Sequence, residues 1–132
     1  MSLLENFTVL KFESNKAMLF LEKPGWIIMN NKLKTQAVEQ LFQAILSLKD
    51  LDEAYDFFED VCTINEILSL SQRFEVAKML REHRTYLDIA EKTGASTATI
   101  SRVNRSLNYG NDGYDRVFER LGMLEKESED NK

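Results

Sequence analysis

One short segment, residues 94–107, gathers the side chains best suited to contact a polyanion. It combines small and hydroxyl-bearing residues with two arginines three positions apart, and it contains no carboxylate. Hydroxyl groups can bond to phosphates or base edges, small side chains let a backbone approach a groove, and arginine neutralises phosphate or recognises guanine. The residues that this pattern selects for DNA contact are Ser96, Thr97, Ala98, Thr99, Ser101, Arg102 and Arg105.

The rest of the chain offers little for catalysis or metal binding. His83 is the only histidine and Cys62 the only cysteine, so no metal-ligand set and no nucleophile with a nearby base can be assembled from them. No glycine-rich phosphate loop is present. We therefore predict a protein that is not an enzyme and needs no cofactor or metal.

Two helices joined by a tight turn are predicted to position the DNA-contacting residues. Thr85 can cap the first helix, with Asp88 at the capping-box position. Gly94 should end it, because glycine adopts a left-handed backbone at low cost, and Ser96 can cap the second helix. An inward stripe of the second helix is formed by Ile100, Val103 and Leu107.

This arrangement is the helix-turn-helix pattern, whose second helix enters the major groove of DNA. The alternative is a helical hairpin that only packs inside a bundle.

Two amphipathic helices are predicted ahead of this motif, over residues 34–48 and 51–62, with Asp50 and Glu53 as a capping box for the second. Phe57 falls partly off the apolar stripe of the second helix, which therefore has two apolar sides. A partner subunit could cover the additional side, and so could a thick core within one subunit.

A third and longest helix is predicted from Thr63, with Glu66 at its capping-box position, to about Glu82. Residues 108–113 have the composition of a loop, and apolar spacing over residues 114–123 indicates a short closing helix. The expected fold class is therefore all-α, with the helix-turn-helix in the C-terminal half of the chain.

We assign the helical domain to residues 29–123. Residues 1–28 are an N-terminal extension that could form a hairpin or be disordered, or that could precede a natural start at Met29. Residues 125–132 are charged and lack apolar anchors, so we assign residues 124–132 to a disordered tail.

Composition favours one folded domain in a reducing compartment. The chain has 132 residues, of which 43% are hydrophobic and 30% charged. No apolar run approaches membrane-spanning length, and a single cysteine cannot form an internal disulfide. We predict a cytoplasmic protein with no membrane contact.

The net charge of −5 is unevenly distributed. Residues 73–109 hold seven Lys/Arg and four Asp/Glu, a local balance of +3, whereas residues 50–66 hold seven acids and no Lys/Arg, a balance of −7. DNA responds to the local patch, because salt screens charges over roughly 8 Å. The acidic block would then face away from the duplex, or it is simply a solvated helix face.

The helix order and the segment Gly94-Ala-Ser-Thr-Ala-Thr-Ile-Ser-Arg-Val-Asn-Arg-Ser-Leu107 resemble the tryptophan repressor superfamily, and most closely its YerC/YecD group. That family has Gly-Ala, then Ala-Thr-Ile-Thr-Arg, and a Ser-Leu pair at matching positions. The similarity spans roughly residues 33–123. It implies an intertwined homodimer whose two recognition helices enter successive major grooves of double-stranded DNA.

The resemblance also implies an effector pocket. The tryptophan repressor uses a threonine before its long helix, an arginine on that helix and an arginine of the recognition helix, and Thr63, Arg73 and Arg102 match them. The family's next residue is a glycine that leaves room for the indole ring, and Val103 stands in its place, so we predict that tryptophan is not the corepressor. Leu87 replaces a guanine-reading arginine, so the operator sequence does not carry over.

The sequence therefore favours a homodimeric, sequence-specific DNA-binding regulator, and within this family a repressor. The competing hypothesis is a helical module that uses the same scaffold to bind another protein.

Overall fold

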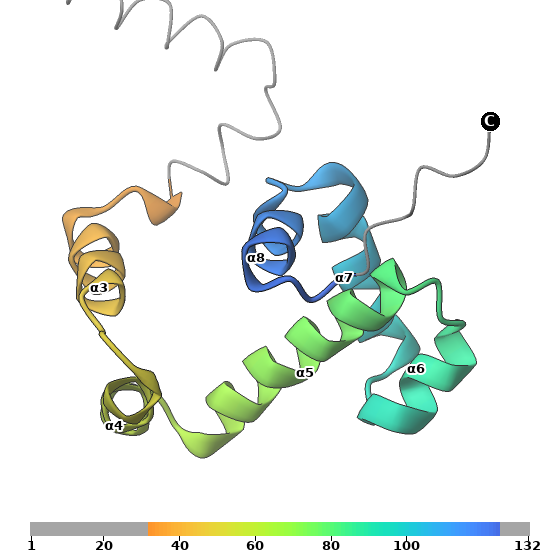
Figure 1. The fold of residues 1–132 in the computed structure, drawn as a ribbon, viewed down its shortest axis with the longest axis horizontal. Coiled ribbons are helices and arrows are strands. Elements are labelled where there is room, and N and C mark those ends of the chain that lie inside the picture. The colour runs from red at the N-terminus through yellow and green to blue at the C-terminus, as the bar shows by residue number, and fades with distance from the viewer. Residues whose placement is uncertain (1–31, 125–132) are drawn as a thin grey trace, which may run out of the picture. The chain divides into compact units, whose positions relative to one another are not determined.

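The computed structural model describes residues 32–124, and every regular element in that range is an α-helix (Figure 1). In chain order the helices are α3 (Gln36–Leu46), α4 (Leu51–Val61), α5 (Ile64–Arg81), α6 (Tyr86–Thr93), α7 (Thr97–Tyr109) and α8 (Gly113–Leu121). The all-α prediction is confirmed. None of these helices is long and apolar enough to cross a membrane. The expectations for residues 1–28 and 125–132 lie outside the described range.

The chain divides into two compact units within α4, between Ala54 and Tyr55. In the first unit, the carboxylate of Asp50 accepts the backbone N–H of Glu53 at the start of α4 (2.9 Å). The Glu53 side chain accepts the N–H of Lys49 (2.9 Å) rather than that of Asp50, so the predicted capping box is displaced by one residue. Helices α3 and α4 contain no buried residue.

Helix α5 begins as its sequence predicts. The hydroxyl of Thr63 accepts the N–H of Glu66 (3.3 Å), and the Glu66 carboxylate accepts the N–H of Thr63 (2.8 Å). The bond from the Thr63 N–H, and a second from the Thr63 hydroxyl (3.0 Å), hold the pKa of Glu66 below its usual value because they stabilise the ionised carboxylate. The helix ends at Arg81, and the following His83 has a left-handed backbone with φ of +59°.

The core of the second unit lies where α5 packs against α6, α7 and α8 (Figure 1). The buried hydrophobic side chains are Val76, Ala77, Met79, Ile89, Ala95, Ile100, Val103, Leu107 and Phe118. Phe118 is fully buried, and its ring centroid lies 5.1 Å from that of Phe74 and 6.1 Å from that of Tyr114. Burying one such side chain contributes about 1.5–3 kcal/mol to stability.

The predicted loop over residues 108–113 is too long. Helix α7 continues to Tyr109, and the side-chain amide of Asn108 donates to Asn104 one turn earlier (3.0 Å). The helix ends at Gly110, where a Cβ would collide with the carbonyl oxygen of Ser106. The closing helix is also shorter than predicted, since α8 ends at Leu121 and excludes Met123.

Candidate nucleic-acid interface

The first helix of the motif is capped as expected at its start. The Thr85 hydroxyl accepts the N–H of Asp88 (3.2 Å). No reciprocal bond from Asp88 completes a capping box; its carboxylate instead pairs with Arg84 (3.5 Å) and Lys92 (3.6 Å). Of the two hydrogen bonds of the predicted capping box, one is therefore present. The Asp88 carboxylate forms ion pairs with Arg84 and Lys92 instead of the second bond.

The turn between α6 and α7 is fixed by three neighbouring residues. Gly94 has φ of +69°, and its N–H reaches the carbonyl of Ala90 (2.9 Å), as predicted for a helix-ending glycine. The Thr93 hydroxyl donates to the carbonyl of Ile89 (2.7 Å) and accepts the N–H of Ala95 (3.2 Å). The direction in which α7 leaves the turn is thus set by hydrogen bonds as well as by the glycine.

Helix α7 presents two distinct faces. The Ser96 hydroxyl caps it by accepting the N–H of Thr99 (3.1 Å), as the sequence predicts. The predicted inward stripe is confirmed, because Ile100, Val103 and Leu107 are all buried. That stripe leaves the opposite side of the helix to solvent.

The predicted DNA-contacting residues lie on the side of α7 away from the core or at its start. Ser96, Thr97, Ala98, Ser101, Arg102 and Arg105 are exposed. Thr99 is half-buried, and its hydroxyl lies 3.0 Å from that of Ser96. Among the described residues, neither Arg102 nor Arg105 forms an ion pair, so both guanidinium groups face solvent. Their contact with DNA stays a prediction.

Other cations of the motif are less available than the local charge balance suggests. Lys78 pairs with Glu82 (3.9 Å), and Arg84 lies 3.8 Å from the same carboxylate. Arg84 and Lys92 also share Asp88. Exposed pairs of this kind hold each other weakly, but they lower the positive potential around α6. Of the three cations on α6 and α7, Arg102 and Arg105 are therefore the two that form no ion pair with a described residue.

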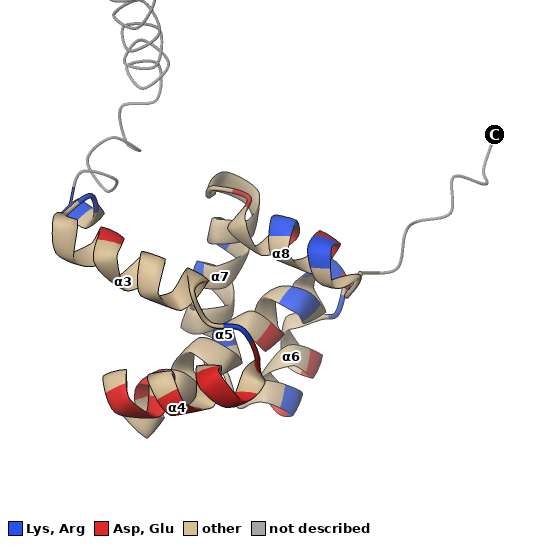
Figure 2. Ribbon diagram, turned by 60° about the vertical axis from the view of Figure 1, so that its left-hand side comes forward, with Lys and Arg blue, Asp and Glu red and all other residues tan. Residues whose placement is uncertain are grey.

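The first turn of α7 also differs in charge from the first turns of the other described helices. Helix α7 has no acidic residue in its first turn, whereas the other five described helices each have at least one. A helix N-terminus carries roughly half a positive charge. Figure 2 shows the same division, with acidic positions gathered on α4 and none on α7. Among the described helices, α7 is therefore the one whose first turn holds no carboxylate to compensate its dipole.

The four residues proposed for an effector pocket are not gathered at one point by the structure. Thr63 is the exposed cap of α5, and the half-buried Arg73 donates to Ser69 (3.2 Å). Thr63 and Arg73 are ten positions apart along the helix, which corresponds to a rise of about 15 Å. Arg102 points to solvent, and Val103 is only 3% exposed, within the core.

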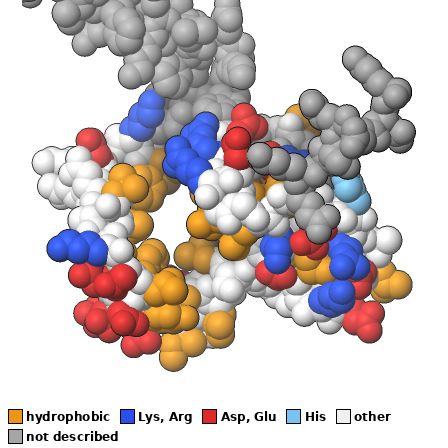
Figure 3. Space-filling view, in the orientation of Figure 1, with side chains coloured by type: hydrophobic (Ala, Val, Ile, Leu, Met, Phe, Trp, Pro, Cys, Tyr) orange, Lys and Arg blue, Asp and Glu red, His pale blue; other side chains and the backbone are white. Residues whose placement is uncertain are grey.

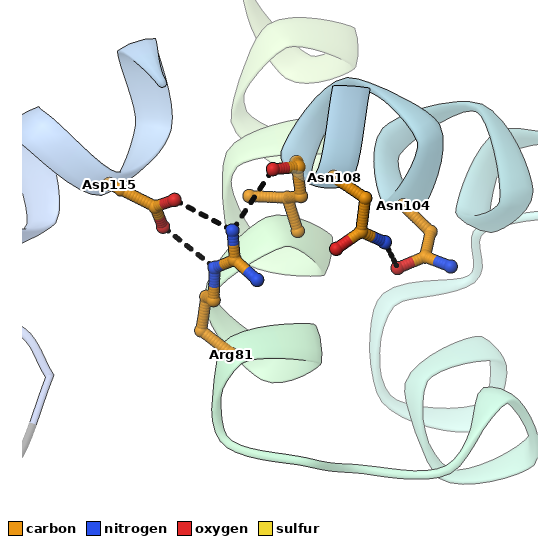
Figure 4. A network of polar contacts seen from close by, with 5 residues as sticks. Arg81, Asn104, Asn108 and Asp115 are labelled. Atoms are coloured by element: carbon orange, nitrogen blue, oxygen red, sulfur yellow. Dashed lines mark hydrogen bonds and ion pairs between the residues drawn. The ribbon is translucent and has the colours of Figure 1, made fainter. Parts of the chain in front are cut away.

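Two side chains of α5 bind the motif in ways that the sequence does not reveal. The amide of Gln72 donates to the carbonyl of Thr93 (3.0 Å). The guanidinium of Arg81 holds both carboxylate oxygens of Asp115 on α8 (2.7 and 2.6 Å) and donates to the carbonyl of Leu107 on α7 (3.0 Å) (Figure 4). Donation to the Asp115 carboxylate raises the pKa of Arg81 above its usual value. The partners are 21 to 34 residues apart, and no periodicity signals such pairs.

The family model for the Trp repressor protein matches residues 36–122 of this chain. The chain belongs to the Trp repressor family. It is 61% identical to the uncharacterized protein YerC of Bacillus subtilis over 98 residues, which are 74% of this chain and 94% of that protein.

A solved structure shows the same family membership at the level of the fold. A Staphylococcus aureus protein, described provisionally as a Trp repressor, superposes with a TM-score of 0.70 at 51% sequence identity. The match covers 73% of this chain and 96% of that one. The predicted resemblance is confirmed, and the Trp repressor family is one of DNA-binding regulators rather than enzymes.

Proposed function

We propose that this chain is a homodimeric transcriptional repressor that binds specific sequences of double-stranded DNA through the outer face of α7. The observation that carries the proposal is the acid-free, exposed face on which Arg102 and Arg105 remain unpaired among the described residues. The opposite face is anchored in the core, so these groups project from a supported helix. A helix in this setting fits the major groove.

A mobility-shift assay with genomic DNA fragments at low and moderate salt tests the proposal. Specific complexes should survive a large excess of random DNA, and their affinity should fall steeply as salt rises, because bound phosphates release counterions. Binding to all fragments alike would reject sequence specificity. No binding to any fragment would favour the alternative function, a protein-binding module.

The exposed apolar residues support a second copy of the chain as the partner. In α3, Phe42 is 54% and Leu46 84% exposed; in the second unit, Ile64 is 74% and Leu68 60% exposed. Figure 3 shows hydrophobic side chains at the surface over α3 and over α4. Large apolar patches are rarely left uncovered in a monomer. Because the family resemblance implies a homodimer, we propose that a second copy, related by a twofold axis, covers these apolar side chains.

Replacement of Leu68 by lysine is expected to break this dimer. The wild-type protein should have twice the 15.3 kDa mass of the chain in analytical ultracentrifugation. Loss of a buried leucine and burial of a charge should raise the dimer dissociation constant about 100-fold or more. Leu87→Lys is the matched control, because Leu87 is 79% exposed on α6 and outside the proposed interface. A monomeric wild-type protein would contradict the proposal.

Within one chain the proposed effector-pocket residues are spread out, since Thr63 and Arg73 are about 15 Å apart along the axis of α5. We propose that any effector pocket also draws on residues of the second copy. Val103 is only 3% exposed, and the resemblance aligns it with the glycine that leaves room for the indole ring; a packed interior has few voids larger than a water molecule. We therefore propose that tryptophan is not the effector and that Val103 holds α7 in place through direct packing.

Calorimetry with L-tryptophan tests this steric argument. The wild-type protein should show no micromolar binding, because valine is stiff about its first torsion and overpacking costs about 1–3 kcal/mol, or roughly ten- to hundredfold in affinity. Val103→Gly should gain affinity, and Val103→Ala should gain less. Micromolar binding by the wild type would overturn the argument. Thermal unfolding of each variant checks that the shortened side chain has not unfolded α7.

A further inference from the structure

Two side-chain hydrogen bonds from α5 reach the helix-turn-helix, one at the last residue of α6, just before the turn into α7, and one in the last turn of α7. The Gln72 amide reaches the Thr93 carbonyl, immediately before the turn that leads into α7, at 3.0 Å. The Arg81 guanidinium reaches the Leu107 carbonyl, near the end of α7, at 3.0 Å. The two donors are nine residues apart on α5, a rise of about 13.5 Å, so they act on separate points.

Both acceptors are carbonyl groups that a helix leaves without an internal partner. Thr93 is the last residue of α6, and Leu107 lies in the last turn of α7. The last four carbonyls of any α-helix need a partner from elsewhere. Both bonds are partly buried, so water competes poorly for these oxygens. The side chains of α5 therefore satisfy one carbonyl group just before the turn into α7 and one in the last turn of α7.

The hydrogen bonds from Gln72 and Arg81 restrict the orientation of α7, which burial of its apolar stripe alone does not. Burial of Ile100, Val103 and Leu107 holds α7 against α5, but the hydrophobic effect is non-directional and permits small slides and rotations. Hydrogen bonds weaken steeply when their angle changes. Asp115 completes the second attachment by fixing the Arg81 guanidinium through two bonds, which leaves Nη2 aimed at Leu107.

We propose that Gln72 and Arg81 are positioning residues that set the register of α7 for DNA recognition, Gln72 at the N-terminal end and Arg81 at the C-terminal end. This inference rests on the proposed function of α7. It predicts that each residue governs a different part of the binding site: Gln72 the contacts of Ser96 to Thr99, and Arg81 those of Arg102 and Arg105.

Hydrogen exchange of the free protein tests the attachment itself. Gln72→Met keeps the side-chain length without a donor, and should speed exchange of the Ala95 and Ile100 amides about three- to tenfold while leaving Gly110 unchanged. Arg81→Lys keeps the charge, and should show the reverse pattern, with the increase at Gly110. Asp115→Asn should repeat the Arg81→Lys pattern more weakly. Equal changes along α7 in all variants would overturn the proposal.

Discrimination between DNA sequences tests the role in recognition. A preferred site is selected from random DNA with the wild-type protein, and each of its base pairs is then changed in turn. Gln72→Met should lose about five- to tenfold discrimination at the pairs that respond to substitution of Ser96 to Thr99, and Arg81→Lys at those that respond to substitution of Arg102 or Arg105. A uniform loss at all pairs would show a merely structural role and overturn the proposal.

Two controls make the outcomes separable. Arg116→Lys on α8 makes the same chemical change as Arg81→Lys at an exposed position and should alter neither readout. Thermal unfolding shows whether each variant remains folded under the assay conditions. If the wild-type protein binds no DNA, the proposed function has failed; the exchange pattern, which involves no DNA, identifies that failure separately from a failure of the attachment.

Discussion

Replacement of both Arg102 and Arg105 by alanine is expected to lower the affinity for specific DNA at least 100-fold. Both guanidinium groups are exposed and unpaired within the described residues, so neither is held by an acid that would compete with phosphate. Each bidentate contact with guanine is worth about 1–3 kcal/mol, and each lost phosphate contact lowers the salt slope by about 0.9. Titration of a labelled site at several salt concentrations measures both effects.

The distribution of the loss over base pairs separates the roles of the two arginines. A phosphate contact should be lost equally for all sequences, whereas a guanine contact should remove discrimination at one base pair. The matched control is Arg116→Ala with Arg120→Ala, because these exposed arginines of α8 carry the same total charge. If the control weakens binding as much as the α7 variant does, net charge rather than the α7 face carries the affinity.

Replacement of Phe118 by alanine is expected to be the most destabilising single change in the core of the second unit. Phe118 is fully buried between α5 and α8, with the rings of Phe74 and Tyr114 beside it. Truncation of a buried phenylalanine costs about 3–5 kcal/mol, because transfer energy is lost and a cavity remains. Urea unfolding measures the free energy of unfolding, and the protein concentration is held fixed because the stability of the proposed dimer would vary with it.

Val117→Ala is the neighbouring control for this change. Val117 is on the same helix but 39% exposed, so its truncation should cost less than about 1 kcal/mol. If the two variants were equally stable, the aromatic group would not anchor α8. Phe118→Leu, which refills most of the cavity, should recover a large part of the lost stability.

Local features of the fold could be predicted from sequence because they depend on residues close together in the chain. The caps at Thr63, Thr85 and Ser96 each use a hydroxyl and an N–H three residues later, so spacing alone identifies them. The left-handed turn at Gly94 follows from residue type. The same locality explains why the inward stripe of α7 was predicted correctly.

Other features depend on tertiary contacts or on exceptions to local rules. Arg81 and Asp115 are 34 residues apart, and nothing in the pattern of α5 distinguishes Arg81 from the solvent-facing cations beside it. His83 adopts a backbone conformation that residue type would assign to glycine. The loop-like composition of residues 108–113 predicts that α7 ends before Asn108. In the structure the helix includes Asn108, whose side-chain amide donates to Asn104 one turn earlier.

The candidate interface was predicted from residue types, and the structure adds which of them are accessible. Spacing placed Arg102 and Arg105 outward, but it could not show that Lys78, Arg84 and Lys92 are paired with acids. Periodicity likewise identified the apolar stripes of α3 and α4. It could not decide whether they are buried within one chain, and neither helix contains a buried residue.

Among the described residues, all the buried side chains lie in the segment from Val76 to Phe118. This distribution has an evolutionary consequence. Helices α3 and α4 contain no buried residue, so under the proposed dimerisation their apolar positions are constrained mainly by the matching surface of a second copy. In a cell that makes two related proteins of this type, a few paired changes in α3 and α4 would prevent mixed dimers while the DNA-binding half stayed the same. We expect sequence divergence between such duplicates to begin in α3 and α4.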